Sequence, residues 1–116
     1  MGQKRVVVLF ERRPFGTIHY VEGLRAALGI ASGWDEHEVE LIFLGEGAWY
    51  ALKNVTRTDA LKYLNTLGKL GFGLKVERES VAELGIAEQD VGSEFGVISR
   101  DELLAILERA DHTVHF

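Results

Sequence analysis

The chain has 116 residues, of which 47% are hydrophobic and 27% charged, and its formal net charge is -5 at pH 7. These values are typical of one soluble globular domain covering residues 1–116, and they exclude a disordered or fibrous chain. Cysteine is absent, which excludes disulfides, zinc–thiolate sites, iron–sulfur clusters and thiolate nucleophiles on this chain. An acidic chain without a basic face also argues against direct nucleic-acid binding.

The apolar stretches are too short for membrane insertion. The runs at residues 6–10 and 26–31 fall far short of the ~20 residues that a spanning helix needs. Lys4 and Arg5 before the first run resemble the start of a signal peptide, but charged residues follow the run at once. We therefore expect a cytoplasmic protein that makes no contact with a membrane.

The first half of the chain alternates between predicted strands and helices. Residues 5–10 form a continuous β-branched and aromatic run, which is typical of a strand buried on both faces. Pro14 and Gly16 end this strand, and Thr17 is suited to cap a helix that runs to about Gly33. A second buried strand and two helical segments are then predicted at residues 39–44, 48–53 and 58–70.

The second half continues this alternation with three short predicted strands, at residues 74–77, 95–98 and 112–116. Ser80 with Glu83 forms a capping-box pattern for a one-turn helix that Gly85 ends. Ser99 with Glu102 forms a second capping box. The helix that it opens is expected to turn four apolar residues inward: Leu103, Leu104, Ile106 and Leu107.

Strands and helices in alternation, with five strands in all, predict a three-layer α/β/α fold with a mainly parallel sheet. Ligands of such folds bind at the carboxyl ends of the strands. Three strand-end loops therefore hold the candidate binding residues, at positions 12–17, 45–48 and 77–80.

The loop after the first strand offers an anion site. Arg12 and Arg13 stand just before Phe15, Gly16 and Thr17, at the start of the first predicted helix. Two guanidinium groups and the free N–H groups of a helix N-terminus can together hold an anion. The segment matches neither a P-loop nor a dinucleotide-binding glycine pattern. A tight turn with two solvated arginines is the alternative interpretation.

The loop after the second strand holds Gly45, Glu46 and Gly47. Glycines permit a sharp turn here, and Glu46 offers an acid or base for which no partner residue is visible. The four histidines lack metal-ligand spacing, and the chain has no serine-nucleophile elbow. We therefore predict no catalytic residue, no metal site and no cofactor.

Four segments in order resemble the DsrE/DsrF/DsrH family, and most closely its DsrF/TusC branch. The first contains Arg13-Pro-Phe-Gly-Thr17 and Glu22-Gly-Leu-Arg-Ala-Ala-Leu28, similar to the branch's turn and following helix. The second has Glu46 where the branch has an aspartate. The segments lie at residues 6–28, 42–48, 67–86 and 110–116.

The resemblance implies a five-stranded parallel α/β/α unit that forms homotrimers, homohexamers or mixed hexamers with DsrE- and DsrH-like subunits. The mixed complexes act in sulfur relay, where a cysteine of the DsrE/TusD-type subunit accepts a persulfide. Many relatives carry a cysteine three residues before the helix-capping serine, which is Ser80 here, so that position is Glu77. A carboxylate cannot hold persulfide sulfur and repels a thiolate. We expect Glu77 to be a solvated edge-strand residue rather than an acid or base.

Two functional hypotheses follow. The first is a non-catalytic, cysteine-free DsrF/TusC-like subunit of a sulfur-relay complex, at most an accessory part of a sulfurtransferase. The second is a free-standing homo-oligomer that binds a small anion at the strand-end loops. An enzyme using Glu46 or His19 is the weakest alternative. Subunit contacts are expected to bury some of the aromatic residues near the loops, namely Trp34, Trp49, Tyr50, Phe72 and Phe95.

Overall fold

A computed structural model describes the chain except for residues 1–2, 15–17, 33–36, 56 and 58–59. Its five strands form one sheet with the order β4-β3-β2-β1-β5, and every neighbouring pair is parallel. The strands are β1 Arg5–Phe10, β2 Glu38–Phe43, β3 Leu74–Glu77, β4 Phe95–Ile98 and β5 His112–His115. The predicted parallel sheet is confirmed.

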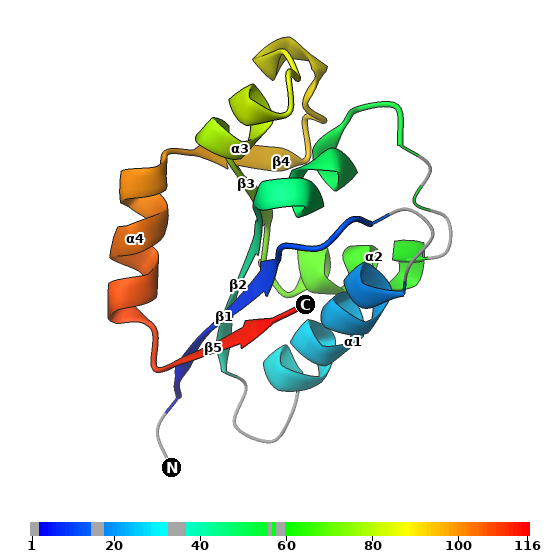
Figure 1. The fold of residues 1–116 in the computed structure, drawn as a ribbon. Helices are drawn as coiled ribbons and strands as arrows, with labels where there is room; N and C mark the ends of the chain where they lie inside the picture. Colours follow the sequence, from blue (N-terminus) through cyan, green and yellow to red (C-terminus); the bar gives the residue numbers. More distant parts are fainter. Residues whose placement is uncertain (1–2, 15–17, 33–36, 56, 58–59) are drawn as a thin grey trace.

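Helices cover both faces of this sheet (Figure 1). Helices α1 (His19–Ala31) and α2 (Leu61–Lys69) lie on one face, and α4 (Arg100–Arg109) lies on the other. The short helix α3 (Arg78–Glu83) and the 3₁₀ segments η1 (Gly45–Ala51) and η3 (Glu88–Asp90) lie beyond the carboxyl ends of the strands. The predicted three-layer α/β/α fold is therefore confirmed. No described helix has both the length and the apolar character that crossing a membrane requires.

The larger core lies between the sheet and the α1/α2 layer, and stacked aromatic rings form its centre. Phe10 and Phe43 stack with centroids 4.3 Å apart, Tyr50 stacks on Phe43 at 5.2 Å, and Phe95 meets Phe43 edge-on at 5.6 Å. Burying one such ring contributes about 2 kcal/mol. Tyr50 and Phe95, expected at subunit contacts, thus belong to the core of this chain. Trp49 and Phe72 are half-buried. Trp34 lies outside the described residues.

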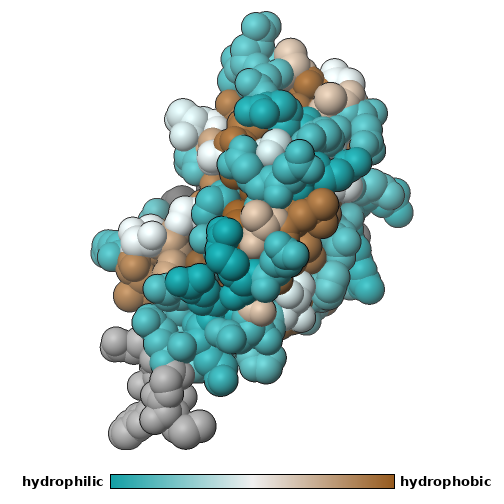
Figure 2. Space-filling model, turned by 90° about the vertical axis from the view of Figure 1, so that its left-hand side faces the viewer, coloured by the Kyte–Doolittle hydropathy of each residue, from teal (hydrophilic) through white to brown (hydrophobic). Residues whose placement is uncertain are grey.

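A smaller apolar cluster lies on the opposite face of the sheet, where α4 is the covering helix. It includes Leu103, Ile106 and Leu107, but Leu104 is 55% exposed, so the expectation that Leu104 faces inward was wrong. The reason is helical spacing: positions 103, 106 and 107 share one stripe, whereas position 104 lies about 100° away. Figure 2 shows this side of the molecule, where hydrophobic patches are separated by a mostly hydrophilic surface.

The two predicted capping boxes have different outcomes. Ser99 accepts a hydrogen bond from the Glu102 backbone N–H and forms the predicted box at the start of α4. The box at Ser80 was wrong. Helix α3 begins at Arg78, directly after β3, with Glu77 as its N-cap, which places Ser80 inside the helix. Gly85, at φ +74°, follows the end of α3 as predicted. The predicted helix starts at Thr17 and Thr58 lie outside the described residues.

Candidate functional site

The predicted site residues gather at one edge of the sheet. Strands β1, β2 and β3 are parallel, so the loops that follow Phe10, Phe43 and Glu77 meet at their carboxyl ends. The described site residues all lie at this edge: Arg12, Arg13, Gly45, Glu46, Gly47, Glu77 and Ser80. Phe15, Gly16 and Thr17 lie outside the described residues. Two separate groups of side chains occupy the edge.

The first group is built around Glu77, which is buried and only 2% exposed. The expectation that Glu77 is a solvated residue of an edge strand was wrong. Strand β3 lies between β2 and β4, and Glu77 pairs in register with Ile98 of β4. The polar alternation in residues 74–77 suggested a solvent-facing side, but the chain that follows β4 covers this end of the strand.

Both carboxylate oxygens of Glu77 accept hydrogen bonds. Arg100 donates from Nε to Oε2 at 3.0 Å and from Nη2 to Oε1 at 3.2 Å. The Ser80 hydroxyl donates to Oε1 at 2.5 Å. Such paired donation from a guanidinium fork is among the strongest forms of carboxylate recognition in proteins. We call Glu77, Ser80, Arg100 and Gly45 the Glu77 cluster.

Gly45 connects the end of β2 to this cluster. Its backbone N–H donates to the Ser80 hydroxyl at 2.8 Å, so that one oxygen joins the loop after β2 to α3. Gly45 has φ +55°, a conformation that favours glycine. Two residues later, a Cβ atom on Gly47 would lie 1.9 Å from the Phe10 carbonyl oxygen, so the turn needs a residue without a side chain. The sharp turn expected of these two glycines is present.

The environment of Glu77 favours its charged form. Burial is the largest single influence and opposes ionisation, but the hydrogen bonds from Arg100 and Ser80 together outweigh it, so the pKa of Glu77 is lowered. The pKa of Arg100 is raised, first by its hydrogen bond to Glu77 and then by that to Glu83. A carboxylate with a lowered pKa and both oxygens occupied is poorly suited to acid–base catalysis near pH 7.

Arg100 is the residue of this cluster that sequence reasoning missed. A usable signal was present, because the Ser99 capping box places Arg100 in the first helical turn directly after β4. Position 100 reaches Glu77 only if β4 lies beside β3, however, and the order of the strands in the sheet was not predicted.

The second group surrounds a shallow hollow of about 270 Å³ near the ends of β1 and β2. Arg13 pairs with Glu46, with Nε 3.5 Å from Oε2, and these side chains are 75% and 61% exposed. Arg12 places Nη1 3.2 Å from Nε2 of His19. Glu11 also lines the hollow. We call this group the Arg13–Glu46 cluster. Its two carboxylates offset the charge of the arginines, and the anion site stays a prediction.

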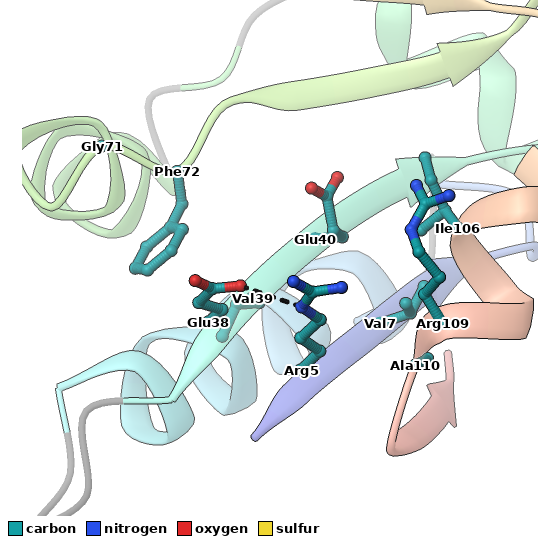
Figure 3. A pocket seen from close by; sticks show the side chains of 10 residues that line it. All are labelled: Arg5, Val7, Glu38, Val39, Glu40, Gly71, Phe72, Ile106, Arg109 and Ala110. Atoms are coloured by element: carbon teal, nitrogen blue, oxygen red, sulfur yellow. Dashed lines mark ion pairs between the residues drawn. The ribbon is translucent and has the colours of Figure 1, made fainter. Parts of the chain in front are cut away.

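A larger hollow of about 440 Å³ opens at the opposite, amino-terminal edge of the sheet (Figure 3). Its charged side chains are largely paired: Arg5 with Glu38 at 3.5 Å, and Glu40 with Lys75. Arg109 extends from α4 along its wall. Because these charges neutralise one another in partly exposed positions, they give this hollow little selectivity for a charged ligand. Within the described residues, no three His, Asp or Glu side chains are grouped to hold a metal ion.

Comparison with known proteins identifies the family. The model of the DsrE/DsrF-like family matches residues 4–116. The crystal structure of the YchN protein from E. coli is similar, with a TM-score of 0.80 and 18% identity over 98% of this chain and 99% of YchN. MTH1491 from Methanobacterium thermoautotrophicum, titled a protein of unknown function, has a TM-score of 0.79 and 9% identity over 98% of this chain and 100% of its own.

At these identities the two structures show a shared fold alone, and a search of curated proteins gave no match. The family model nevertheless covers nearly the whole sequence, including β1 through β5 and the Glu77 cluster. The chain therefore belongs to the DsrE/DsrF-like family.

Proposed function

We propose that the chain is a non-catalytic subunit, similar to the DsrF/TusC branch, of a complex that transfers persulfide sulfur. One observation carries the proposal. At the end of β3, where many relatives carry a cysteine, this chain has Glu77 buried and hydrogen-bonded through both oxygens. The chain has no cysteine elsewhere to replace that thiol.

The chemistry of the Glu77 cluster supports this role. Persulfide transfer needs a thiolate that attacks the outer sulfur of a donor and keeps it as a persulfide. A carboxylate forms no such bond, and its negative charge repels an incoming thiolate or persulfide. Arg100, which could otherwise attract such an anion, already donates to Glu77 and Glu83. Sulfur chemistry in such a complex must therefore use a thiol on another subunit.

The partners that fit this role are DsrE- and DsrH-like chains that carry the missing cysteine. The chain would contribute the shape of the complex and the position of its neighbours. Co-expression with its cysteine-bearing relatives, followed by affinity purification and light scattering, tests this assembly. We expect a stable mixed oligomer. A chain that purifies alone while those relatives are present in excess would contradict the proposal.

A labelling experiment tests where the sulfur goes. The purified complex is loaded with a persulfide donor, and each subunit is examined by intact-mass spectrometry before and after reduction. We expect a reducible mass increase of one sulfur atom on the cysteine-bearing partner and none on this chain. A partner variant whose cysteine is replaced by serine is the matched control and should abolish the label. Labile sulfur on the isolated wild-type chain would overturn the proposal.

A further inference from the structure

Arg57 is a deeply buried cation outside the Glu77 cluster. Its side chain is only 10% exposed. The guanidinium carbon lies 5.1 Å from the centre of the Tyr50 ring and 5.2 Å from the centre of the Phe95 ring. Cation–π contacts of this kind stabilise a guanidinium group, but they do not neutralise its charge.

The hydrogen-bond partners of Arg57 are unevenly distributed. Nη2 donates to the carbonyl oxygens of Tyr50 and Leu52 at 2.6 and 2.7 Å. Nη1 is held only loosely, 3.5 Å from the carbonyl oxygen of Val55 and 3.8 Å from the carboxylate of Glu94. Nε is buried without a hydrogen-bond partner. Charge-assisted pairs usually lie at about 2.7–2.9 Å, so among the described residues this buried cation has no close anion.

A cavity of about 350 Å³ adjoins Arg57 beneath α2. Its walls come from α2, from the turn that follows α2 and from the start of β3. They are mainly apolar and include the side chains of Leu64, Leu67, Phe72 and Leu74. Arg57 and Glu94 are its charged lining residues. The volume falls in the range of small-molecule sites, which typically combine apolar walls with a few polar groups.

We propose that this cavity binds a small organic monocarboxylate with an apolar body. The body lies against the apolar walls, and the carboxylate binds the loosely held side of Arg57. The Glu94 carboxylate lies near that side of Arg57, and it can move away because its side chain is 53% exposed and its ion pair is 3.8 Å long. This site lies at the amino ends of β3 and β4, so it is independent of the sulfur-transfer role proposed above.

Calorimetric titration of the full chain with hexanoate and benzoate tests the proposal, with hexanol and benzyl alcohol as uncharged analogues of matched shape. We expect each carboxylate to bind at least about tenfold more tightly than its alcohol, because a charge-assisted hydrogen bond is lost in the alcohol. Equal binding of acid and alcohol, or no binding of either acid at millimolar concentration, would overturn the proposal.

Three variants separate binding from folding. Gly68 lines the cavity, and a Cβ atom there meets no other atom within 4 Å, so Gly68→Leu fills the space while leucine favours the helix more than glycine does. We expect Gly68→Leu to fold and to lose carboxylate binding. Glu94→Gln removes the competing carboxylate and should tighten binding several-fold. Arg57→Gln should abolish the preference for acids over alcohols.

Chemical-shift mapping distinguishes this site from the Arg13–Glu46 cluster. Titration of ¹⁵N-labelled chain with hexanoate should move the backbone signals of Leu64, Gly68 and Gly73 and leave those of Arg13 and Glu46 unchanged. Movement confined to Arg13 and Glu46, or carboxylate binding that survives Gly68→Leu, would overturn the assignment of the cavity. Neither result would bear on the sulfur-transfer proposal, because that rests on the oligomer and on the partner's thiol.

Discussion

The carboxyl edge of the sheet holds two carboxylate–guanidinium pairs in opposite environments. In the Glu77 cluster the carboxylate side chain is 3% exposed and bound by both Arg100 and Ser80. In the Arg13–Glu46 cluster the carboxylate side chain is 61% exposed and lies 3.5 Å from the Arg13 Nε atom. Exposed ion pairs contribute little because water solvates each charge nearly as well, whereas a buried charge depends on its partners. The comparison predicts that stability depends on the first pair far more than on the second.

Removing the buried carboxylate should have the largest effect. Glu77→Ala leaves the Ser80 hydroxyl and the Arg100 guanidinium without their shared acceptor and opens a cavity, so we expect a loss of about 3 kcal/mol in unfolding free energy. Urea denaturation measures it. Glu83→Ala is the matched control, because Glu83 also contacts Arg100 but its side chain is 68% exposed. A Glu77→Ala loss no greater than that of the control would remove the distinction between the clusters.

Removing the Arg100 cation should reverse the way in which Glu77 makes the stability of the fold depend on pH. In Arg100→Met, burial of Glu77 acts without the opposing guanidinium, so the folded-state pKa of Glu77 should rise above its usual value. A group with a raised folded pKa destabilises the fold when ionised, and this variant should therefore recover stability relative to wild type as pH falls from 7 to 4. Melting temperatures across that range provide the test. Parallel curves for variant and wild type would show that Arg100 does not control the ionisation of Glu77.

The wild-type chain should lose the contribution of Glu77 in acid. The folded pKa of Glu77 is lowered below the ordinary value of 4.5, so its stabilisation is complete above that value and is lost as pH falls through the folded pKa. Glu77→Gln lacks this titration and should cost about 1–2 kcal/mol at pH 7. The difference between the two proteins should shrink as pH falls below 4.5 and through the folded pKa. A difference that stays constant until both proteins unfold in acid would indicate that Glu77 does not titrate in this way.

The exposed pair should give the smallest effect. Arg13→Ala and Glu46→Gln should each change the unfolding free energy by no more than about 0.5 kcal/mol, because both side chains remain well solvated. Urea denaturation again measures the unfolding free energy. When it is repeated at high salt, the change caused by each substitution should vanish, because salt screens exposed charges. Losses above 1 kcal/mol would place this cluster among the structural ion pairs and contradict the comparison.

Much of the fold could be predicted from local pattern. Strands β1, β3 and β4 begin and end at the predicted residues, since a continuous apolar run marks β1 and short segments of apolar residues near glycine turns mark β3 and β4. The three-layer arrangement follows from the alternation of strands and helices. The family resemblance, carried by short segments spread along the chain, is confirmed by the family model.

The details of the site could not be predicted from the sequence, because they depend on contacts between residues that are far apart in the chain. Glu77 looked solvated because residues 74–77 alternate, but the position of β4 beside β3 buries it and brings Arg100 to it. Ser80 looked like a helix cap because it precedes Glu83 by three residues, yet its hydroxyl joins Glu77 to Gly45 instead. Arg57 gave no sequence signal, since its burial arises from Tyr50 and Phe95, which come from different parts of the chain.

The first strand of the sheet pairs with the last. β1 lies between β2 and β5, and the Arg5 backbone N–H donates to a side chain 106 residues later, that of Asp111. During synthesis, β1 therefore has one unpaired row of backbone N–H and C=O groups until residues 112–115 leave the ribosome. This row belongs to a strand whose residues 6–10 are all buried in the finished sheet, so nascent chains carry an aggregation-prone edge until β5 emerges.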